Sequence, residues 1–306
     1  MSTTKNPRDL NPKTAPQSGP LDTSEQNSIV DAAVRRLLED IDRNRVRLGP
    51  LMPVASVLKS LDAQPVIGRA HLIEAIVREP CAVALLLRAA NSRYWDPVTG
   101  GIVSVETSVD VIGERGIREV IQYLATEVPE RWAWDAAPQH LRKMWTNTIY
   151  TALAARNLAA RTGVIKPVLA YACAMLHNIG EPLLIQYISR EANGIELLQP
   201  PYSTAGHVIA SCHQMIGARV LESWNIPQTI VRCARHHHET VDDGLHAVIV
   251  AAWQAALRYG YVYLGAHPDT PLLERVMHQL GQPMRVLDQI TEDIAMELNQ
   301  TLAKRS

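Results

Sequence analysis

The chain of 306 residues contains no phenylalanine, and aromatic residues of all kinds make up only 5% of it. Leu, Ile, Val, Ala and Met must therefore fill the core, and a hydrophobic content of 47% is ample for a chain of this length. The cysteines form no Cys-x-x-Cys pair and are too few to cross-link so long a chain; they are Cys81, Cys173, Cys212 and Cys233. We expect reduced, mostly buried thiols.

The sequence also lacks an excess of charge of either sign. The formal net charge is −1 and the Lys and Arg residues are dispersed, which argues against a nucleic-acid partner. The N-terminus has no apolar run that could serve as a signal sequence, and no later stretch reaches the ~20 apolar residues that a membrane span needs. By elimination, we expect a cytoplasmic protein without a membrane partner.

Helical spacing of apolar residues dominates the chain after a polar start. Residues 1–27, rich in Pro, Ser and Thr, predict a disordered tail, and Ser28 is the expected N-cap of the first helix. No run of alternating apolar and polar residues requires a strand, so we predict an all-α fold. Later helices are expected at 54–61, 72–77, 83–90, 105–112, 117–124, 141–163, 168–176, 207–224, 227–238, 244–259, 270–279 and 284–302.

The helical pattern lapses between Pro129 and Pro138. We place a boundary there, between an N-terminal helical lobe at 28–135 and a C-terminal helical lobe at 136–306. The tryptophans are expected in the core or at the interface between lobes, because scattered Trp residues form no stacking platform for bases.

Several short motifs, in order, resemble the HDOD family, a bacterial relative of the HD phosphohydrolases. They are Leu51-Met52-Pro53, Arg78-Glu79-Pro80, Arg88-Ala89-Ala90-Asn91-Ser92, Ser104-Val105-Glu106, Leu176-His177-Asn178-Ile179-Gly180, His213-Gln214-Met215-Ile216-Gly217 and His236-His237-His238. The resemblance implies a two-lobed, HD-like helical protein of a family without demonstrated catalysis, found in signalling and regulatory settings beside response-regulator and cyclic-di-GMP modules.

The HD enzymes bind one or two hard metal ions through a His-Asp step, further histidines and a distal Asp. Laid onto this chain, those positions hold Asn147, His177, Asn178, His213, His237, His238 and Trp253. Both acids are therefore replaced. An amide oxygen is neutral and cannot bridge two cations as a carboxylate does, so the resemblance implies a degenerate site, no resident cofactor and no hydrolase activity.

Other interpretations of these residues remain open. Glu239 could restore a carboxylate, although it is expected to face solvent, and Gly260-Tyr261-Val262 lacks the Pro of the cyclic-di-GMP hydrolase subgroup. The histidines could simply be packed core residues. Alternatively, Cys173 with His177 and Cys233 with His237, each four residues apart, offer thiolate and imidazole donors to Zn²⁺ or to a redox sensor.

Two classes of function follow. We favour a non-enzymatic regulatory protein that binds either a protein partner in a signalling pathway or a small signalling ligand. Pathways that use cyclic-di-GMP are among the candidate pathways. The alternative is a metal-dependent phosphohydrolase acting on a nucleotide or cyclic dinucleotide through an altered metal shell.

Overall fold

The structure, a computed structural model, describes residues 22–49, 73, 76–92, 101–124, 138–192, 204–239, 243–262 and 266–303. Across these ranges the regular elements are helices, with no strand, so the predicted all-α fold is confirmed. The helices are α1 (Thr23–Asp42), α4 (Pro80–Ala90), α5 (Val105–Gln122), α7 (Pro138–Thr162), α8 (Pro167–Leu176), α9 (Gly180–Glu191), α10 (Thr204–Ser223), α11 (Gln228–His236), α12 (Gly244–Arg258), α13 (Thr270–Gln279) and α14 (Arg285–Ala303).

Short polar side chains fix where several helices begin. Ser104 accepts a hydrogen bond from the backbone N–H of Thr107 and caps α5, directly before the start of the helix that the sequence predicts at 105–112. Asp243 caps α12 through the N–H of His246, and Asp269 caps α13 through the N–H of Leu272. These caps satisfy backbone donors that the first helical turn leaves without partners, so the local sequence sets the helix boundaries.

The first helix begins earlier than the sequence predicts. Asp22 rather than Ser28 is the N-cap of α1, because Asp22 and Glu25 form a capping box in which each side chain accepts from the other's backbone N–H. The prediction of a disordered tail at 1–27 is therefore wrong for residues 23–27, which belong to α1. Residues 1–21 of that tail lie outside the described residues.

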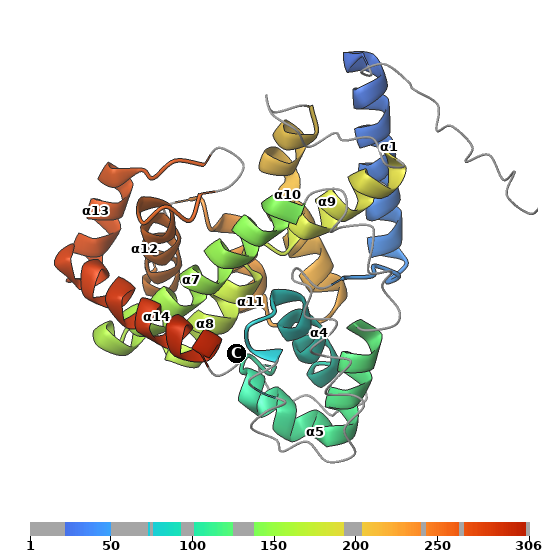
Figure 1. Cartoon of the computed structure of the whole chain (residues 1–306). Helices are drawn as coiled ribbons and strands as arrows, with labels where there is room; N and C mark the ends of the chain where they lie inside the picture. The colour runs from blue at the N-terminus through green and yellow to red at the C-terminus, as the bar shows by residue number, and fades with distance from the viewer. Residues whose placement is uncertain are drawn as a thin grey trace, which may run out of the picture.

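The core is built around α7, which packs on α8 and α12 and also contacts α14 (Figure 1). The pair α4 and α5 lies together at one end of the molecule, and α4 touches α7 and α8. Trp224 and Tyr150 are the largest fully buried side chains, and Leu and Ile supply much of the rest. The Phe-free core is thus filled as expected.

The first helix packs on the second half of the chain. Helix α1 lies along α9 and α10 (Figure 1). The sequence assigns this helix to an N-terminal lobe at 28–135, whereas its main contacts are with helices of the predicted C-terminal lobe at 136–306. The boundary near residues 129–138 and the helix expected at 54–61 fall outside the described residues, so that division stays a prediction.

The helices on either side of the His-Asn step are strongly apolar. The stretch Pro167–Glu191, taken as one continuous helix, is long and apolar enough to cross a membrane, with a mean hydropathy of 1.4. The sequence predicts that no stretch reaches the length and apolarity of a membrane span, but this stretch does. Its window is 83% buried within the fold, where α8 packs on α7 and α9 packs on α1 and α10. Its apolar surface is used in the core.

Asn91 connects the end of α4 to Ile102, in the segment that precedes α5. Its Nδ2 donates to the carbonyl oxygens of Leu87 and Ile102, at 2.9 Å each, and its Oδ1 accepts from the N–H of Ile102 at 2.8 Å. Asn91 therefore ends the helix by bonding backbone. Arg88, in the last turn of α4, donates to Asn44 and lies over the ring of Trp224.

We predict that Asn91→Asp lowers the free energy of unfolding by about 3 kcal/mol, because the buried carboxylate would face two carbonyl oxygens that now receive hydrogen bonds. Asn157→Asp is the matched control, since Asn157 makes one such bond, to Leu153, and is only partly buried. Urea unfolding followed by circular dichroism measures both. Equal losses in the two variants would contradict the role given to Asn91.

Candidate functional site

Four histidines meet where helices end. His177 directly follows α8, His237 directly follows α11, His238 is the next residue, and His213 projects from α10. The rings of His177 and His237 meet edge to face with centroids 4.9 Å apart, and His213 lies 5.2 Å from His237 and 5.0 Å from His238. The structure therefore brings together four of the residues that the sequence singled out.

A glycine crossing lets α9 and α10 approach closely enough to form this cluster. A Cβ atom on Gly180 would lie 2.0 Å from the carbonyl oxygen of His213 and 2.7 Å from the backbone nitrogen of Gly217. Gly180 is the last residue of the His-Asn-Ile-Gly motif, so the motif's glycine is needed to seat His213 opposite the start of α9. No other residue type fits this contact without moving backbone.

Three of the rings are held through Nδ1 by the helices that carry them. Nδ1 of His177 lies 2.6 Å from the carbonyl oxygen of Ala174, and Nδ1 of His237 lies 3.0 Å from that of Ala234. Nδ1 of His213 lies 3.0 Å from the carbonyl oxygens of both Ile209 and Ala210. A carbonyl oxygen only accepts, so each Nδ1 carries the proton and donates. Each Nε2 is thereby left with a lone pair directed away from its own helix.

The Nε2 atoms of His213 and His237 face each other inside the cluster. Nε2 of His213 and Nε2 of His237 are 3.2 Å apart, and Nε2 of His177 is buried without a hydrogen-bond partner among the described residues. The potential ligand atoms of His213, His237 and His238 all lie within 4.8 Å of one another. This arrangement presents several nitrogen donors toward one point.

Glu181 is a site residue that the sequence interpretation missed. Its side chain is buried, and its Oε1 lies 4.0 Å from Nε2 of His213. A signal for it existed, because Glu181 follows His177 by four residues and the backbone between them stays near helical geometry at His177 and Ile179. Residues four apart in such a path share a face, so a carboxylate was to be expected beside the cluster.

Trp253 is the residue near which the resemblance places the distal acid. Its ring, carried by α12, stacks on that of His238 at 4.5 Å with 20° between the planes, and it meets His237 edge to face. The side chain is almost completely buried. An apolar indole thus covers one side of the histidine cluster where a metal-binding carboxylate was expected in an HD enzyme.

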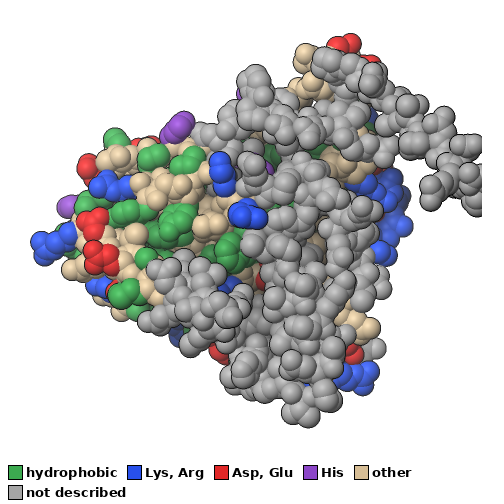
Figure 2. All heavy atoms as spheres, in the orientation of Figure 1, with side chains coloured by type: hydrophobic (Ala, Val, Ile, Leu, Met, Phe, Trp, Pro, Cys, Tyr) green, Lys and Arg blue, Asp and Glu red, His purple; other side chains and the backbone are tan. Residues whose placement is uncertain are grey.

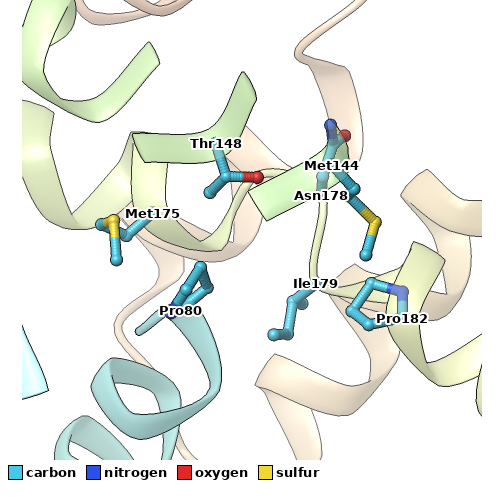
Figure 3. Close-up of a pocket in the computed structure, with 7 residues that line it drawn as sticks. All are labelled: Pro80, Met144, Thr148, Met175, Asn178, Ile179 and Pro182. Atoms are coloured by element: carbon cyan, nitrogen blue, oxygen red, sulfur yellow. The ribbon is translucent and has the colours of Figure 1, made fainter. Parts of the chain in front are cut away.

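Both asparagines at the positions of expected ligands are buried. Asn147 is fully buried on α7, and its Nδ2 donates to the carbonyl oxygen of Tyr261 at 2.7 Å. Asn178 lines a small cavity of about 10 Å³, room for roughly one water molecule (Figure 3). Its other lining residues come from α4, α7, α8 and the start of α9, and they are Pro80, Met144, Thr148, Met175, Ile179 and Pro182.

Comparison with known proteins decides the family. A sequence model of the HDOD domain matches residues 48–240, which is most of the chain. This chain belongs to the HDOD domain family. A curated relative, an uncharacterized protein of Treponema pallidum, is 23% identical over 180 residues, which cover 57% of this chain and 34% of that relative. The match thus spans about a third of the relative's length.

Solved structures share the HDOD fold of this chain. A structure of the MmoQ response regulator of Methylococcus capsulatus aligns with a TM-score of 0.64 and 18% identity, covering 80% of this chain and 98% of that one. A structure of a fragment of the same protein gives a TM-score of 0.61, covering 78% of this chain and 93% of that one. At this identity the likeness shows the fold alone.

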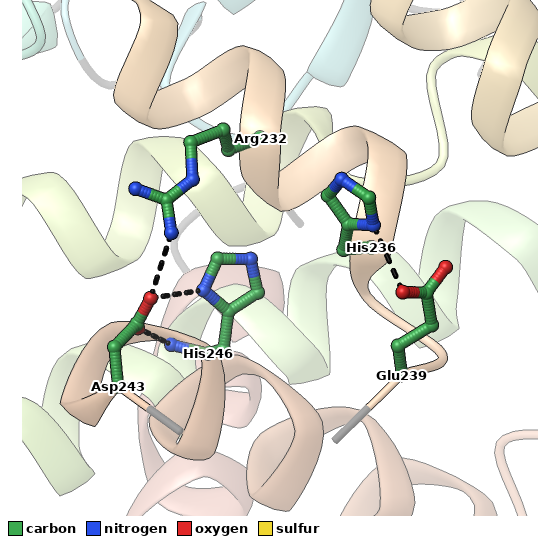
Figure 4. A network of polar contacts seen from close by, with 5 residues as sticks. All are labelled: Arg232, His236, Glu239, Asp243 and His246. Atoms are coloured by element: carbon green, nitrogen blue, oxygen red, sulfur yellow. Dashed lines mark hydrogen bonds and ion pairs between the residues drawn. The ribbon is translucent and has the colours of Figure 1, made fainter. Parts of the chain in front are cut away.

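In this HDOD chain Glu239 does not supply the missing carboxylate. Its Oε2 lies 3.0 Å from Nδ1 of His236, and its side chain is exposed, as expected (Figure 4). The same view shows Asp243 between Arg232 and His246, with 3.0 Å to Arg232 Nη2 and 2.8 Å to His246 Nδ1. Two of these contacts, Arg232 with Asp243 and His236 with Glu239, join residues on either side of His237 and His238 in the sequence.

The thiols and histidines do not form the mixed site that their spacing suggested. Among the described residues, the group of side chains close enough to share a metal is made of histidines only. Cys173 instead hydrogen-bonds to Cys233, and both are buried. Burial, followed by the contact with Cys233, raises the pKa of the Cys173 thiol well above its usual value, so it stays protonated and unreactive.

Burial also keeps the histidines neutral. Desolvation lowers the pKa of His177 to about 4, against a smaller opposing effect of its bond to Ala174. The pKa of His213 is lowered by desolvation, and that of His237 is lowered well below its usual value by desolvation and by its histidine neighbours. The HDOD site is therefore a set of neutral nitrogen donors at pH 7.

We predict that Gly180→Ala lowers the free energy of unfolding by about 3 kcal/mol, because the new methyl group would overlap the carbonyl of His213. Gly217→Ala on the facing helix is the control, since its nearest contact would be 3.1 Å and alanine favours a helix by up to about 1 kcal/mol. Urea unfolding of both variants measures the difference. Similar stabilities for the two would refute the crossing argument.

We predict that stability falls as the pH is lowered from 7 to 5. In the unfolded chain His177 takes up a proton near pH 6.5, whereas in the folded protein it does so only near pH 4. The contribution of His177 to the free energy of unfolding is therefore complete above about pH 6.5 and is lost as the pH falls toward 4. At pH 5 this residue alone removes about 2 kcal/mol.

The measurement is urea unfolding at pH 7, 6 and 5 in the presence of a chelator. His177→Asn can retain the bond to Ala174 through its amide and cannot titrate, so it should show a shallower pH dependence than the wild type. Identical pH dependence in the two proteins would show that His177 is not held neutral.

Proposed function

We propose that this HDOD protein is a non-enzymatic regulator that acts by binding a protein partner in a signalling pathway or a small signalling ligand. The observation that carries the proposal is the fate of three positions where the resemblance expects metal ligands, namely the first histidine and the two acids. Asn147 is bonded to the backbone of Tyr261, Asn178 lines a cavity the size of a water molecule, and Trp253 stacks on His238.

Charge supports this proposal. Hydrolysis of a phosphodiester at a two-metal centre needs anionic ligands that bridge the ions and hold a water molecule at lowered pKa. The carboxylate found beside the histidines is Glu181, on one side of the cluster. A single carboxylate among neutral rings does not supply the charge that two hard divalent ions require.

Space supports it as well. The cavity that reaches Asn178 has about 10 Å³, whereas pockets for small molecules are typically about 300 Å³ or more. The indole of Trp253 covers His238 from the α12 side. His177, His213 and His237 are buried, so His238 is the exposed member of the cluster.

The kind of partner is inferred from the surface and from the fold. On the face seen in Figure 2, acidic and basic side chains lie interspersed near α13 and α14, which suits a protein surface better than the phosphate backbone of nucleic acid. The fold neighbour MmoQ is described as a response regulator. This analogy supports a signalling role and names no partner.

A metal-dependent phosphohydrolase with an altered shell is the second candidate, and Glu181 beside the histidines is the observation that favours it. We predict no turnover above background of mononucleotides, cyclic dinucleotides or a chromogenic phosphodiester with Mg²⁺, Mn²⁺, Fe²⁺ or Ni²⁺. His177→Ala is the control for contaminating hydrolases. Turnover by the wild type that disappears in His177→Ala would overturn the proposal in favour of this second candidate.

Binding is tested directly by using the full chain as bait in an extract of its native bacterium and reading captured proteins and nucleotides by mass spectrometry. The proposal expects a partner or nucleotide recovered in near-stoichiometric amount. Recovery of neither, together with turnover in the enzymatic assay, would favour the second candidate.

A further inference from the structure

We propose that the protein binds one Zn²⁺ ion through Nε2 of His213, the imidazoles of His237 and His238, and the carboxylate of Glu181. Three of its ligands, His213, His237 and His238, occupy positions of the HD pattern. The fourth, Glu181, belongs to no HD position, and the His-Asn step is not used. The site is independent of the proposed function, since a zinc ion held by a full set of protein ligands stabilises a fold without catalysing a reaction.

The spacing of the donors fits zinc. Nε2 of His213 and Nε2 of His237 are 3.2 Å apart, and a tetrahedral site with Zn–N bonds of ~2.05 Å places two nitrogens about 3.3 Å apart. The donor atom of His238 lies within 4.8 Å of both, and Oε1 of Glu181 lies 4.0 Å from His213 Nε2. Glu181 must move toward His237 and His238 to complete the four-coordinate shell.

The protons are already placed as a metal requires. His213 and His237 each donate Nδ1–H to backbone carbonyls, so both Nε2 atoms of the close pair carry lone pairs rather than a proton to share. Two lone pairs facing each other at 3.2 Å repel unless a cation lies against them. Backbone bonds at the far nitrogen are the usual outer support of a metal-bound histidine.

The surrounding charge favours a cation. Helices α8 and α11 end at the cluster, and the C-terminal end of a helix carries partial negative charge. Glu181 adds a formal negative charge, and Trp253 shields one side of the rings from solvent. Imidazole-rich donor sets suit Zn²⁺ better than Mg²⁺ or Ca²⁺, which prefer oxygen.

The ion would join parts of the chain that are far apart in sequence. His213 lies on α10, Glu181 on α9, and His237 and His238 on the turn that leads to α12. Bound zinc would fix that turn against α9 and α10, which makes the turn's position dependent on metal supply.

The test uses the full chain purified without a histidine tag, exchanged into buffer containing Zn²⁺ and then freed of loosely bound ion. Elemental analysis should give close to one zinc per chain, and a chelator should lower the melting temperature. Zinc well below one per chain, with no effect of the chelator, would overturn the proposal.

The variants assign the ligands. His237→Asn can keep the bond to Ala234 through its amide but lacks Nε2, so its Zn²⁺ affinity should fall by at least about 100-fold in competition with a fluorescent chelator. The matched control is His236→Asn, whose imidazole pairs with Glu239 outside the cluster and should leave affinity unchanged. Equal affinities in the two variants would refute the assignment.

A spectrum of the unmodified chain tests the site even if a variant fails to fold. Co²⁺ in place of Zn²⁺ should give the intense visible bands of a four-coordinate ion without a sulfur-to-metal charge-transfer band, because the site contains no thiolate. Weak bands of six-coordinate Co²⁺, or a thiolate band indicating Cys173 or Cys233, would contradict the ligand set.

Discussion

The contact between the backbones of α9 and α10 governs the site, because His213 can reach the other histidines only if these two helices nearly touch. Gly180 allows this approach, and its absent side chain leaves room for the carbonyl of His213. The same contact places Glu181, the residue after Gly180, beside the His213 ring. A motif usually considered for its ligands therefore also carries the packing requirement that brings those ligands together.

The sequence predicted the helices well because caps and apolar spacing act locally. Ser104 caps α5 where the predicted helix at 105–112 begins, and α13 has the predicted bounds of Thr270–Gln279. Local patterns say little about which helices pack together. Helix α1 lies against α9 and α10, far along the chain, and the capping box at Asp22 extended it beyond the limit that polar composition suggested.

The same limit explains what was missed in the site. Alignment of motifs identified His177, His213, His237 and His238, which the structure brings together. Glu181 belonged to no motif of the resemblance, and its nearness to His213 depends on the helix crossing rather than on residue spacing alone. Conversely, Cys173 and Cys233 had suitable spacing to histidines, but the packing of α8 on α11 directs the two thiols toward each other.

The resemblance expects a histidine and two acids at the positions of Asn147, Asn178 and Trp253, and the residues present there suit the buried interior of this fold. Buried carboxylates without cations would have to remain charged at a cost of several kcal/mol each or take up protons. An amide at the fully buried Asn147 satisfies a backbone carbonyl with no charge, and an indole at Trp253 contributes apolar contact with His238. Histidines, by contrast, are compatible with burial because the imidazole rings are neutral. Three of the rings also donate from Nδ1 to backbone carbonyls. With no acid at these positions, the nitrogen donors of the cluster stay neutral, which is compatible with the single cation that we propose.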